Sequence, residues 1–230
     1  MDPGLYIAAS GMLAEQVRQS QLANDLSNAS TPGYKPDQAE QQSFGSLLLS
    51  NTVSGQTIGT LNTGVRIDKV VTDTSPAALQ QTGQPLDFGI AGTGYFALQT
   101  ASGVRYTRDG QFSSNAAGQL TDANGNRVLG QNGQPIAVSA KGTVSPTALG
   151  VFNVPNAAKQ GNNLFTGTAA GRGAGGVRQG ELEASGVDAV HTMTDMIASL
   201  RAYQAGQSAL QSINQTMQEN AQSVGSLGGG

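Results

Sequence analysis

Cysteine and tryptophan are both absent from this 230-residue chain, and histidine occurs once. Without cysteine the chain has no disulfide framework, no thiolate nucleophile and no cysteine-ligated metal. The single histidine, His191, excludes a multi-histidine metal site, and we interpret it as a residue on a helix surface. We therefore predict no catalytic residue, no cofactor-binding residue and no metal ligand, and we do not expect an enzyme.

Charge is also scarce. Charged residues make up 12% of the chain and the formal net charge is −3, whereas a typical globular protein has about 25% charged residues. Nucleic-acid binding needs clustered lysine and arginine to neutralise phosphates, and this composition argues against it. Low charge combined with 32 glycines suits a protein that is packed against other proteins.

Long apolar runs are missing as well. No stretch approaches the roughly 18 continuous apolar residues of a membrane-spanning helix. Residues 1–20 lack the basic start and apolar core of a secretory signal peptide. We expect a chain that stays in the cytoplasm or is exported by a route that leaves its N-terminus uncut, and composition does not separate the two.

The middle of the chain has the pattern of a small antiparallel β domain. Between residues 64 and 168, short β-like runs alternate with turn signals such as Asp109-Gly110 and Asn132-Gly133. These dipeptides reach the positive φ angles that tight hairpins need, and their spacing favours an all-antiparallel arrangement. The predicted strands are residues 65–71, 88–90, 95–99, 104–107, 127–129, 136–138 and 149–154.

The first segment predicts a helix over residues 5–28, which ends at Thr31-Pro32-Gly33 because proline cannot continue a helix. Its apolar residues recur at intervals of three and four. We call the following residues the N-terminal stripe: Leu5, Ala9, Met12, Leu13, Val17, Leu22 and Leu26.

The last segment carries the longest regular pattern. No proline occurs between Glu181 and Val224, so a helix of roughly 40 residues and about 60 Å is predicted. Its apolar residues step by three and four, which is the spacing of a coiled-coil seam. We call the following residues the C-terminal stripe: Val187, Val190, Met193, Met196, Ile197, Leu200, Tyr203, Leu210, Met217 and Val224.

Two readings of the C-terminal stripe compete. It could pack on the chain's own β domain, but a domain of about 100 residues is too small to cover so long a helix. The opposite face is rich in glutamine and serine, although a solvated helix face normally carries many lysines and glutamates. We therefore interpret both stripes as surfaces that pack against other copies of the chain.

The predicted fold class is α+β, with long N- and C-terminal helices forming a coiled-coil-like assembly domain around a central antiparallel β domain. We divide the chain into an N-terminal helix and motif (1–42), a linker or extended arm (43–63), the β domain (64–168), a glycine-rich joint (169–180) and a C-terminal assembly helix (181–230). We read Glu181, Glu183 and Asp188 as acids that stabilise the start of that helix. Arg18, Lys35 and Arg201 are candidate anchoring cations, and the sequence does not decide among them. Tyr106, Arg108 and Asp109 are read as hairpin residues, with an intersubunit contact as the alternative.

Several motifs resemble those of one known family. Residues 22–35 read LANDLSNASTPGYK, which is similar to the Asn-Asn-Leu-Ala-Asn…Thr-Pro-Gly-Tyr signature of flagellar axial proteins, with Asp25 and Ser27 as departures. Residues 180–188 and 196–205 resemble the C-terminal segment of the same family, and residues 92–120 resemble its β domain. The motif residues are Asn24, Leu26, Asn28, Thr31, Pro32, Gly33 and Tyr34.

This resemblance implies a structural subunit of the bacterial flagellar basal-body rod, located in the basal body. It implies export by the flagellar export apparatus and assembly with itself and with other rod and hook subunits. Hook subunits have longer central regions, so a rod subunit fits 230 residues better. The alternatives are a surface or phage-tail fibre protein with a coiled-coil helix, and an enzyme with a helical oligomerisation tail.

Overall fold

The computed structural model describes residues 3–43, 46–50, 57–62, 64–161 and 163–227. The chain forms two compact units. One, the helix–ribbon unit, is built from Met1–Asn24, Asp37–Val71 and Val190–Gly230. The other, the β unit, is built from Asp25–Pro36 and Thr72–Ala189. The class is α+β as predicted, with one helix near each end of the chain and an antiparallel β region between them.

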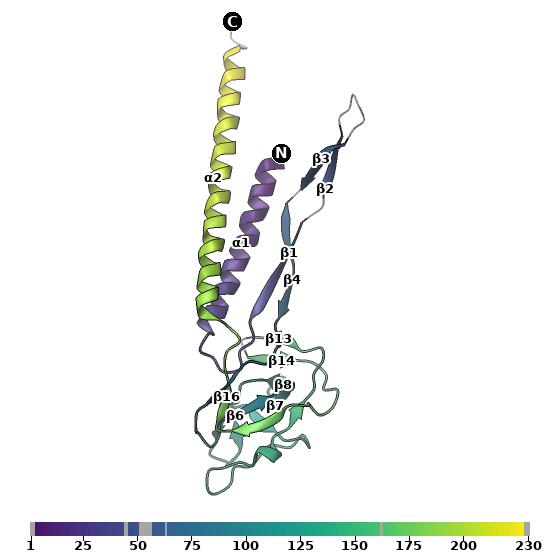
Figure 1. The fold of residues 1–230 in the computed structure, drawn as a ribbon, viewed down its shortest axis with the longest axis vertical. Helices are drawn as coiled ribbons and strands as arrows, with labels where there is room; N and C mark the ends of the chain where they lie inside the picture. Colours follow the sequence, from purple (N-terminus) through teal and green to yellow (C-terminus); the bar gives the residue numbers. More distant parts are fainter. Residues whose placement is uncertain (1–2, 44–45, 51–56, 63, 162, 228–230) are drawn as a thin grey trace. The chain divides into compact units, whose positions relative to one another are not determined.

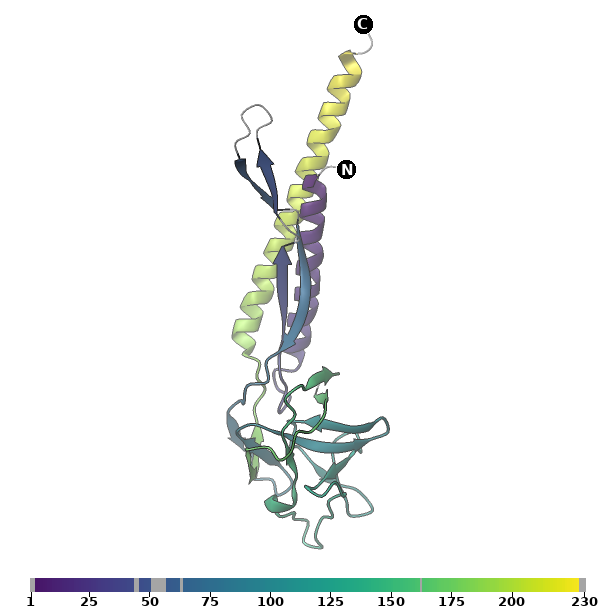
Figure 2. The ribbon, with the colours of Figure 1, turned by 90° about the vertical axis from the view of Figure 1, so that its right-hand side faces the viewer.

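Two helices and two β ribbons make up the helix–ribbon unit. Helix α1 (Pro3–Ser27) and helix α2 (Ala189–Leu227) lie side by side, as Figures 1 and 2 show. Strand β1 (Asp37–Ser43) pairs with β4 (Val65–Thr72), and β2 (Ser46–Ser50) pairs antiparallel with β3 (Thr57–Asn62). In α1, Ser10 and Glu15 contact the β1–β4 ribbon: Val65 N–H donates to Ser10 Oγ, and Gln41 Nε2 donates to Glu15 Oε1.

The predicted arm over residues 43–63 differs from the observed structure in its described part. We expected an irregular extended segment because the sequence has no clear period there. Instead, β2 and β3 pair from Ser46 with Asn62 to Ser50 with Thr57. Strand pairing is made by backbone hydrogen bonds, which any sequence without proline can form, so the lack of a clear period did not exclude it. Residues 44–45, 51–56 and 63 lie outside the described residues.

The C-terminal helix begins later than predicted. We placed its start at Glu181, but Glu181–Glu183 forms strand β16, which pairs with β5 (Leu79–Gln81). A tight turn at Gly180, with φ of 74°, leads into this strand. The helix α2 starts only at Ala189, after Gly186. The long proline-free segment correctly indicated a helix, but its first residues, Glu181–Glu183, pair with β5 instead.

The β unit is centred on an eight-stranded sheet of antiparallel pairs. The order along the main path is β13-β14-β8-β7-β11-β10-β9, and β12 pairs with β7 off this path. These strands are β7 (Tyr95–Thr100), β8 (Gly103–Thr107), β9 (Ser113–Ser114), β10 (Leu120–Thr121), β11 (Arg127–Leu129), β12 (Val151–Phe152), β13 (Ala158–Gln160) and β14 (Leu164–Thr166).

Smaller pairs complete this unit. Strand β6 (Phe88–Ala91) pairs with β15 (Gly176–Gln179), and a short 3-10 helix covers Pro146–Ala148. The predicted strands at 88–90, 95–99, 104–107 and 127–129 are confirmed in this unit, and the strand at 65–71 is confirmed as β4 of the helix–ribbon unit. Of residues 136–138, only Ala137 forms an isolated bridge, and only Val151–Phe152 of the predicted strand 149–154 is a strand.

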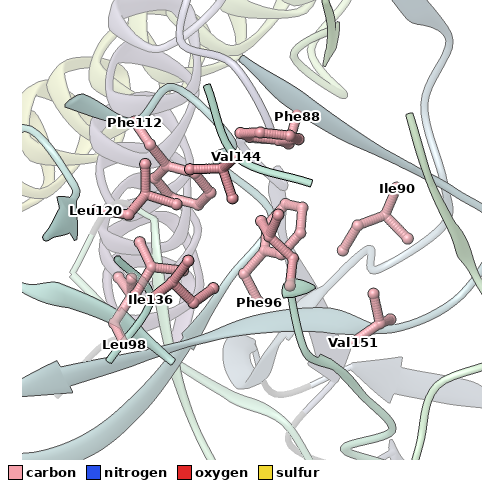
Figure 3. Close-up of a cluster of buried hydrophobic side chains, with 11 residues drawn as sticks. Phe88, Ile90, Phe96, Leu98, Phe112, Leu120, Ile136, Val144 and Val151 are labelled. Atoms are coloured by element: carbon pink, nitrogen blue, oxygen red, sulfur yellow. The ribbon is translucent and has the colours of Figure 1, made fainter. Parts of the chain in front are cut away.

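The core of the β unit is apolar and aromatic. Figure 3 shows Phe88, Phe96 and Phe112 converging with aliphatic side chains from the strands and loops around them. The rings of Phe96 and Phe112 meet edge to face at 5.3 Å between centroids, a favoured aromatic geometry. A second cluster around Tyr95, Tyr106 and Phe165 is also buried. These clusters hold the sheet of the β unit together.

Candidate functional site: the motif clasp and the helix surfaces

We call residues 28–35 the motif loop, and this loop packs within the β unit. After α1 ends at Ser27, Thr31 N–H donates to the Asn28 carbonyl and Gly33 N–H donates to the Glu183 carbonyl at 2.8 Å. Gly33 has φ of 66°, which favours glycine. A Cβ at this position would lie 2.4 Å from the backbone carbon of Arg108. Glycine is therefore required here both by the backbone angle and by the close approach of another segment.

A buried ion cluster fastens the loop, and we call Lys35, Arg108 and Glu183 the motif clasp. Lys35 Nζ lies 2.6 Å from Glu183 Oε1, and Arg108 Nη1 lies 3.0 Å from Glu183 Oε2. All three side chains are at most 2% exposed. The Ala77 N–H also donates to Glu183 Oε1 at 2.7 Å. One carboxylate thus joins three segments that are far apart in the sequence.

The two cations of the clasp find further acceptors. Lys35 Nζ donates to the Ser75 carbonyl at 2.6 Å, and Arg108 Nη1 donates to the Gly92 carbonyl at 2.9 Å. The Arg108 guanidinium also lies 5.2 Å from the centre of the Tyr95 ring, within cation–π range. Buried charges cost several kcal/mol each unless they are paired and hydrogen-bonded. These contacts compensate part of that cost, and Arg108 Nε is buried without a hydrogen-bond partner.

Tyr34 anchors the loop on its other side. Its side chain is fully buried, and its hydroxyl donates to Asp25 Oδ1 at 2.7 Å. The ammonium of Lys159 lies 4.0 Å from the centre of the Tyr34 ring and donates to the Lys35 carbonyl at 2.6 Å. Asp25, which departs from the family signature, therefore has a structural use as the acceptor for the motif tyrosine.

The motif loop also meets the segment that precedes α2. Ser185 Oγ donates to the Asn28 carbonyl at 3.0 Å and accepts from Val187 N–H at 3.2 Å. Of the predicted motif residues, Asn28, Gly33 and Tyr34 are buried, Leu26, Thr31 and Pro32 are half-buried, and Asn24 is exposed. The sequence grouped these residues as a family signature. In the structure most of them lie where the first segment of the β unit, Asp25–Pro36, contacts the last residues of that unit, around Glu183 and Ser185.

Sequence reasoning missed the roles of Glu183 and Arg108. We assigned Glu183 to the dipole of the C-terminal helix, but it lies in β16, before that helix begins, and its carboxylate is buried in the clasp. Arg108 was read as a hairpin residue and is 2% exposed. Nothing in the sequence showed that Glu183 and Arg108 meet. Lys35 is buried in the clasp, but the sequence did not separate it from Arg18 and Arg201 as a candidate anchoring cation.

A pocket of about 350 Å³ lies beside the loop, and its lining includes Thr31, Asp109 and Asn163. Burial raises the pKa of the Asp109 carboxyl above its ordinary value, although hydrogen bonds from Gln111 N–H and from the Asn163 amide oppose the shift. Asn163 Oδ1 is buried without a hydrogen-bond partner. Among the described residues, no group of three or more His, Cys, Asp or Glu could hold a metal ion.

In the helix–ribbon unit, α1 and α2 meet through small residues. Ser199 is buried and its hydroxyl donates to Glu15 Oε2 at 2.6 Å. One heptad further on, a Cβ at Gly206 would lie 2.8 Å from Met12 Cγ. One heptad earlier, Thr192 is buried too. Small residues at this spacing let two helices approach closely, so this line faces α1 in the same chain.

The stripe residues divide into half-buried and exposed members, and Val187, which we expected in the C-terminal helix, precedes α2. Half-buried members are Leu5, Ala9, Met12, Leu22, Leu26, Val187, Met196, Tyr203 and Leu210. Exposed members are Leu13, Val17, Val190, Met193, Ile197, Leu200 and Met217. The side chain of Val224 lies outside the described residues. Contacts within the chain thus bury part of each predicted stripe, and the remaining large apolar side chains are exposed.

Comparison with known proteins adds the family. Residues 5–35 match a family model described as flagella basal body rod protein. Residues 89–160 match the flagellar hook protein FlgE/F/G D1 domain, and residues 178–223 match the flagellar basal body rod FlgEFG protein C-terminal model. The three matches follow the order of α1 with the motif loop, the sheet, and β16 with α2.

Curated relatives match nearly end to end. The chain is 31% identical to the flagellar hook-basal body complex protein FlhO of Bacillus subtilis, over 97% of this chain and 99% of the relative. It is 31% identical to the flagellar basal-body rod protein FlgG of Caulobacter vibrioides, over 95% of this chain and 98% of the relative. FlgG of Bacillus subtilis is 28% identical over 94% of this chain and 96% of the relative.

The chain belongs to the flagellar rod and hook protein family. It is a structural subunit of the flagellar basal-body rod rather than an enzyme, and the fibre-protein alternative is not favoured. Within the described residues, no helix is both long and apolar enough to cross a membrane.

Proposed function

We propose that this subunit builds the rod by adding head-to-tail to copies of itself and to other axial subunits through α1 and α2, which form a coiled-coil-like assembly domain. The observation that carries the proposal is the exposure of large apolar side chains on both helices. Leu13 is 64% exposed, Ile197 54% and Leu200 46%. Burying such side chains gains roughly 25 cal/mol for each Å² of apolar surface removed from water.

The polar surface of α2 supports close packing between identical helices. Between Val187 and Val224 the formally charged residues are Asp188, Asp195, Arg201 and Glu219. Glutamine and serine fill most of the remaining outer positions. Neighbouring copies of such a helix do not repel each other strongly, whereas helices that stay in water usually carry many charges.

Ordering on assembly completes the mechanism. Fixing the backbone costs about 1–2 kcal/mol per residue, and a helix that buries only one narrow line recovers little of that cost. We therefore expect α1 and α2 to be partly disordered in the free subunit and to order when neighbours cover them. Export through the flagellar export apparatus in an unfolded state fits a chain with no cysteine. Segments 1–42 and 181–230 then act in assembly, and segment 64–168 forms the body between them.

A truncation tests this proposal. Removing residues 207–230 should leave a soluble, β-rich monomer that is absent from isolated basal bodies, because half of α2 is lost. The double variant Leu200→Asp/Leu210→Asp should behave in the same way at full length. The measurements are motility of a complemented deletion strain and immunodetection of the subunit in basal bodies. Normal incorporation of either variant would disprove assembly through the terminal helices.

A further inference from the structure

An apolar groove of about 320 Å³ runs along the helix–ribbon unit between α1 and β4. Its walls are formed by Tyr6, Leu13 and Val17 from α1 and by Val65 and Ile67 from β4. Arg66 is the one charged residue among those that line it. Leu13 and Val17 are 64% and 48% exposed, so the groove is open to water.

A ridge of similar chemistry stands on α2. Met193, Ile197 and Leu200 are spaced by four and three residues, so their side chains lie along one line of the helix. They are 51%, 54% and 46% exposed. We call these three residues the α2 ridge. Its members are uncharged aliphatic or thioether side chains, like most of the groove.

The ridge and the groove face away from the contact between the two helices. Ser199 and Glu15 form that contact. Ile197 precedes Ser199 by two positions, and Leu13 precedes Glu15 by two. Two residues turn an α-helix by about 200°, which places both apolar side chains on the far sides of their helices. A chain therefore does not fill its own groove with its own ridge.

We propose that the α2 ridge of one subunit docks into the α1–β4 groove of the next subunit. This inference rests on the proposed function, and it specifies which two surfaces meet. Because the two surfaces differ, the contact is heterologous, and a repeated heterologous contact generates an open polymer. The partner is a second copy of this chain.

The dimensions of the two surfaces favour this occupant. The exposed apolar line from Tyr6 to Val17 covers about 16 Å of α1, and the line from Val190 to Leu200 covers about 15 Å of α2. Beyond Val17 the α1 line continues with exposed Ser20 and Asn24, and beyond Leu200 the α2 line continues with glutamines. Both surfaces thus change from apolar to neutral polar over the same length.

A lipid surface fits less well. Helices that lie on membranes carry many lysines and arginines on their polar face. In α2, Arg201 is the one residue of either type. A second copy of the chain is therefore the better match for an apolar ridge with an almost uncharged surround.

Cysteine cross-linking tests the contact, because the native chain has no cysteine to interfere. The double variant Leu13→Cys/Ile197→Cys replaces the native subunit in cells, and isolated basal bodies are treated with a mild oxidant. We expect a ladder of dimers, trimers and larger species on non-reducing gels, because each copy would link to the next. In the matched control Leu13→Cys/Ala198→Cys, the second cysteine is turned by about 100°, and at least tenfold less ladder is expected.

Three results would overturn the inference. Incorporation of the double variant without a ladder would exclude this pair of surfaces while leaving assembly through the helices intact. Dimers from Leu13→Cys alone would show a symmetric contact instead. Failure of the native chain to appear in basal bodies would overturn the proposed function, and the inference with it.

A charge substitution gives an independent readout. Ile197→Asp should lower the amount of subunit in basal bodies at least tenfold, whereas Ala198→Asp, on the neighbouring exposed position, should be incorporated normally. Vesicle flotation of the purified variants tests whether the α2 ridge binds lipid instead. If Ile197→Asp is incorporated normally but loses binding to anionic lipid vesicles, the ridge is a lipid contact and the proposal is wrong.

Discussion

Lys35 and Glu183 are 148 residues apart in the sequence and form an ion pair of 2.6 Å between Lys35 Nζ and Glu183 Oε1. The pair joins the end of the motif loop to strand β16, which precedes α2 in the sequence. Because neither side chain is exposed, water does not screen the attraction or replace either partner. The first and last segments of the β unit are therefore held together at one buried point.

The first prediction concerns that point. Glu183→Gln leaves the cations of Lys35 and Arg108 buried without a counter-charge, and breaking a buried pair in this way costs about 3–5 kcal/mol. We expect a loss of this size in urea unfolding followed by tyrosine fluorescence. Glu40→Gln is the control, because Glu40 and Lys69 form an ion pair at 3.3 Å with side chains more than half exposed, which is worth less than about 1 kcal/mol. Equal losses would contradict the structural role of the clasp.

The second prediction concerns the motif glycine. Gly33→Ala forces a side chain into a left-handed backbone, at about 1–2 kcal/mol, and also places a Cβ 2.4 Å from the Arg108 backbone. Gly118→Ala is the matched control, because Gly118 has φ of 71° with nothing within 4 Å of the added Cβ. The urea midpoint should fall markedly further for Gly33→Ala. The same shift in both variants would mean that only the backbone angle matters at Gly33.

The third prediction concerns the line where α1 and α2 meet. Gly11→Ala should stabilise α1 by up to about 1 kcal/mol, because nothing lies within 4 Å of the added Cβ. Gly206→Ala should show no such gain, because its Cβ would lie 2.8 Å from Met12 Cγ. Helix content from far-UV circular dichroism on heating measures both. Adding Met12→Ala to Gly206→Ala should relieve the clash, and an equal gain for both single variants would contradict the close approach.

The fourth prediction concerns pH. The pKa of Asp109 is raised from 3.8 chiefly by burial, so the folded state binds its proton more tightly than the unfolded state does. Stability is then lost as pH rises from the ordinary pKa through the raised one. Asp109→Asn removes this loss, because the amide carries no charge at any of these pH values. We expect the variant to be more stable than the parent protein between about pH 4 and neutrality, and equally stable in acid.

Asp73→Asn is the control of opposite sign. Hydrogen bonds from Ser75 lower the pKa of Asp73, so its contribution is present above the ordinary pKa and is lost as pH falls through the lowered one. This variant should therefore be less stable than the parent protein at neutral pH and should approach it in acid. Urea midpoints across the pH range measure both variants. Parallel curves for Asp109→Asn and Asp73→Asn would contradict the assigned environments.

Features that depend on residues close together in the sequence could be predicted without the fold. Apolar residues at intervals of three and four, without proline, specify a helix wherever they occur, and α1 matched its predicted range closely. Glycine-containing turns specified the hairpins of the β region for the same reason, since they act over four residues. The motif of residues 22–35 was sufficient to indicate the family that the comparisons then established.

Which distant groups meet depends on the folded chain as a whole. The pairing of Glu183 with Lys35 and Arg108, the strand at Glu181–Glu183 and the hairpin of β2 and β3 all depend on partners elsewhere in the chain. The same holds for the two sides of α2, where Ser199 faces α1 and Ile197 faces water. A heptad pattern states that a helix has an apolar side, but the position of the neighbouring helix determines which residues that side buries.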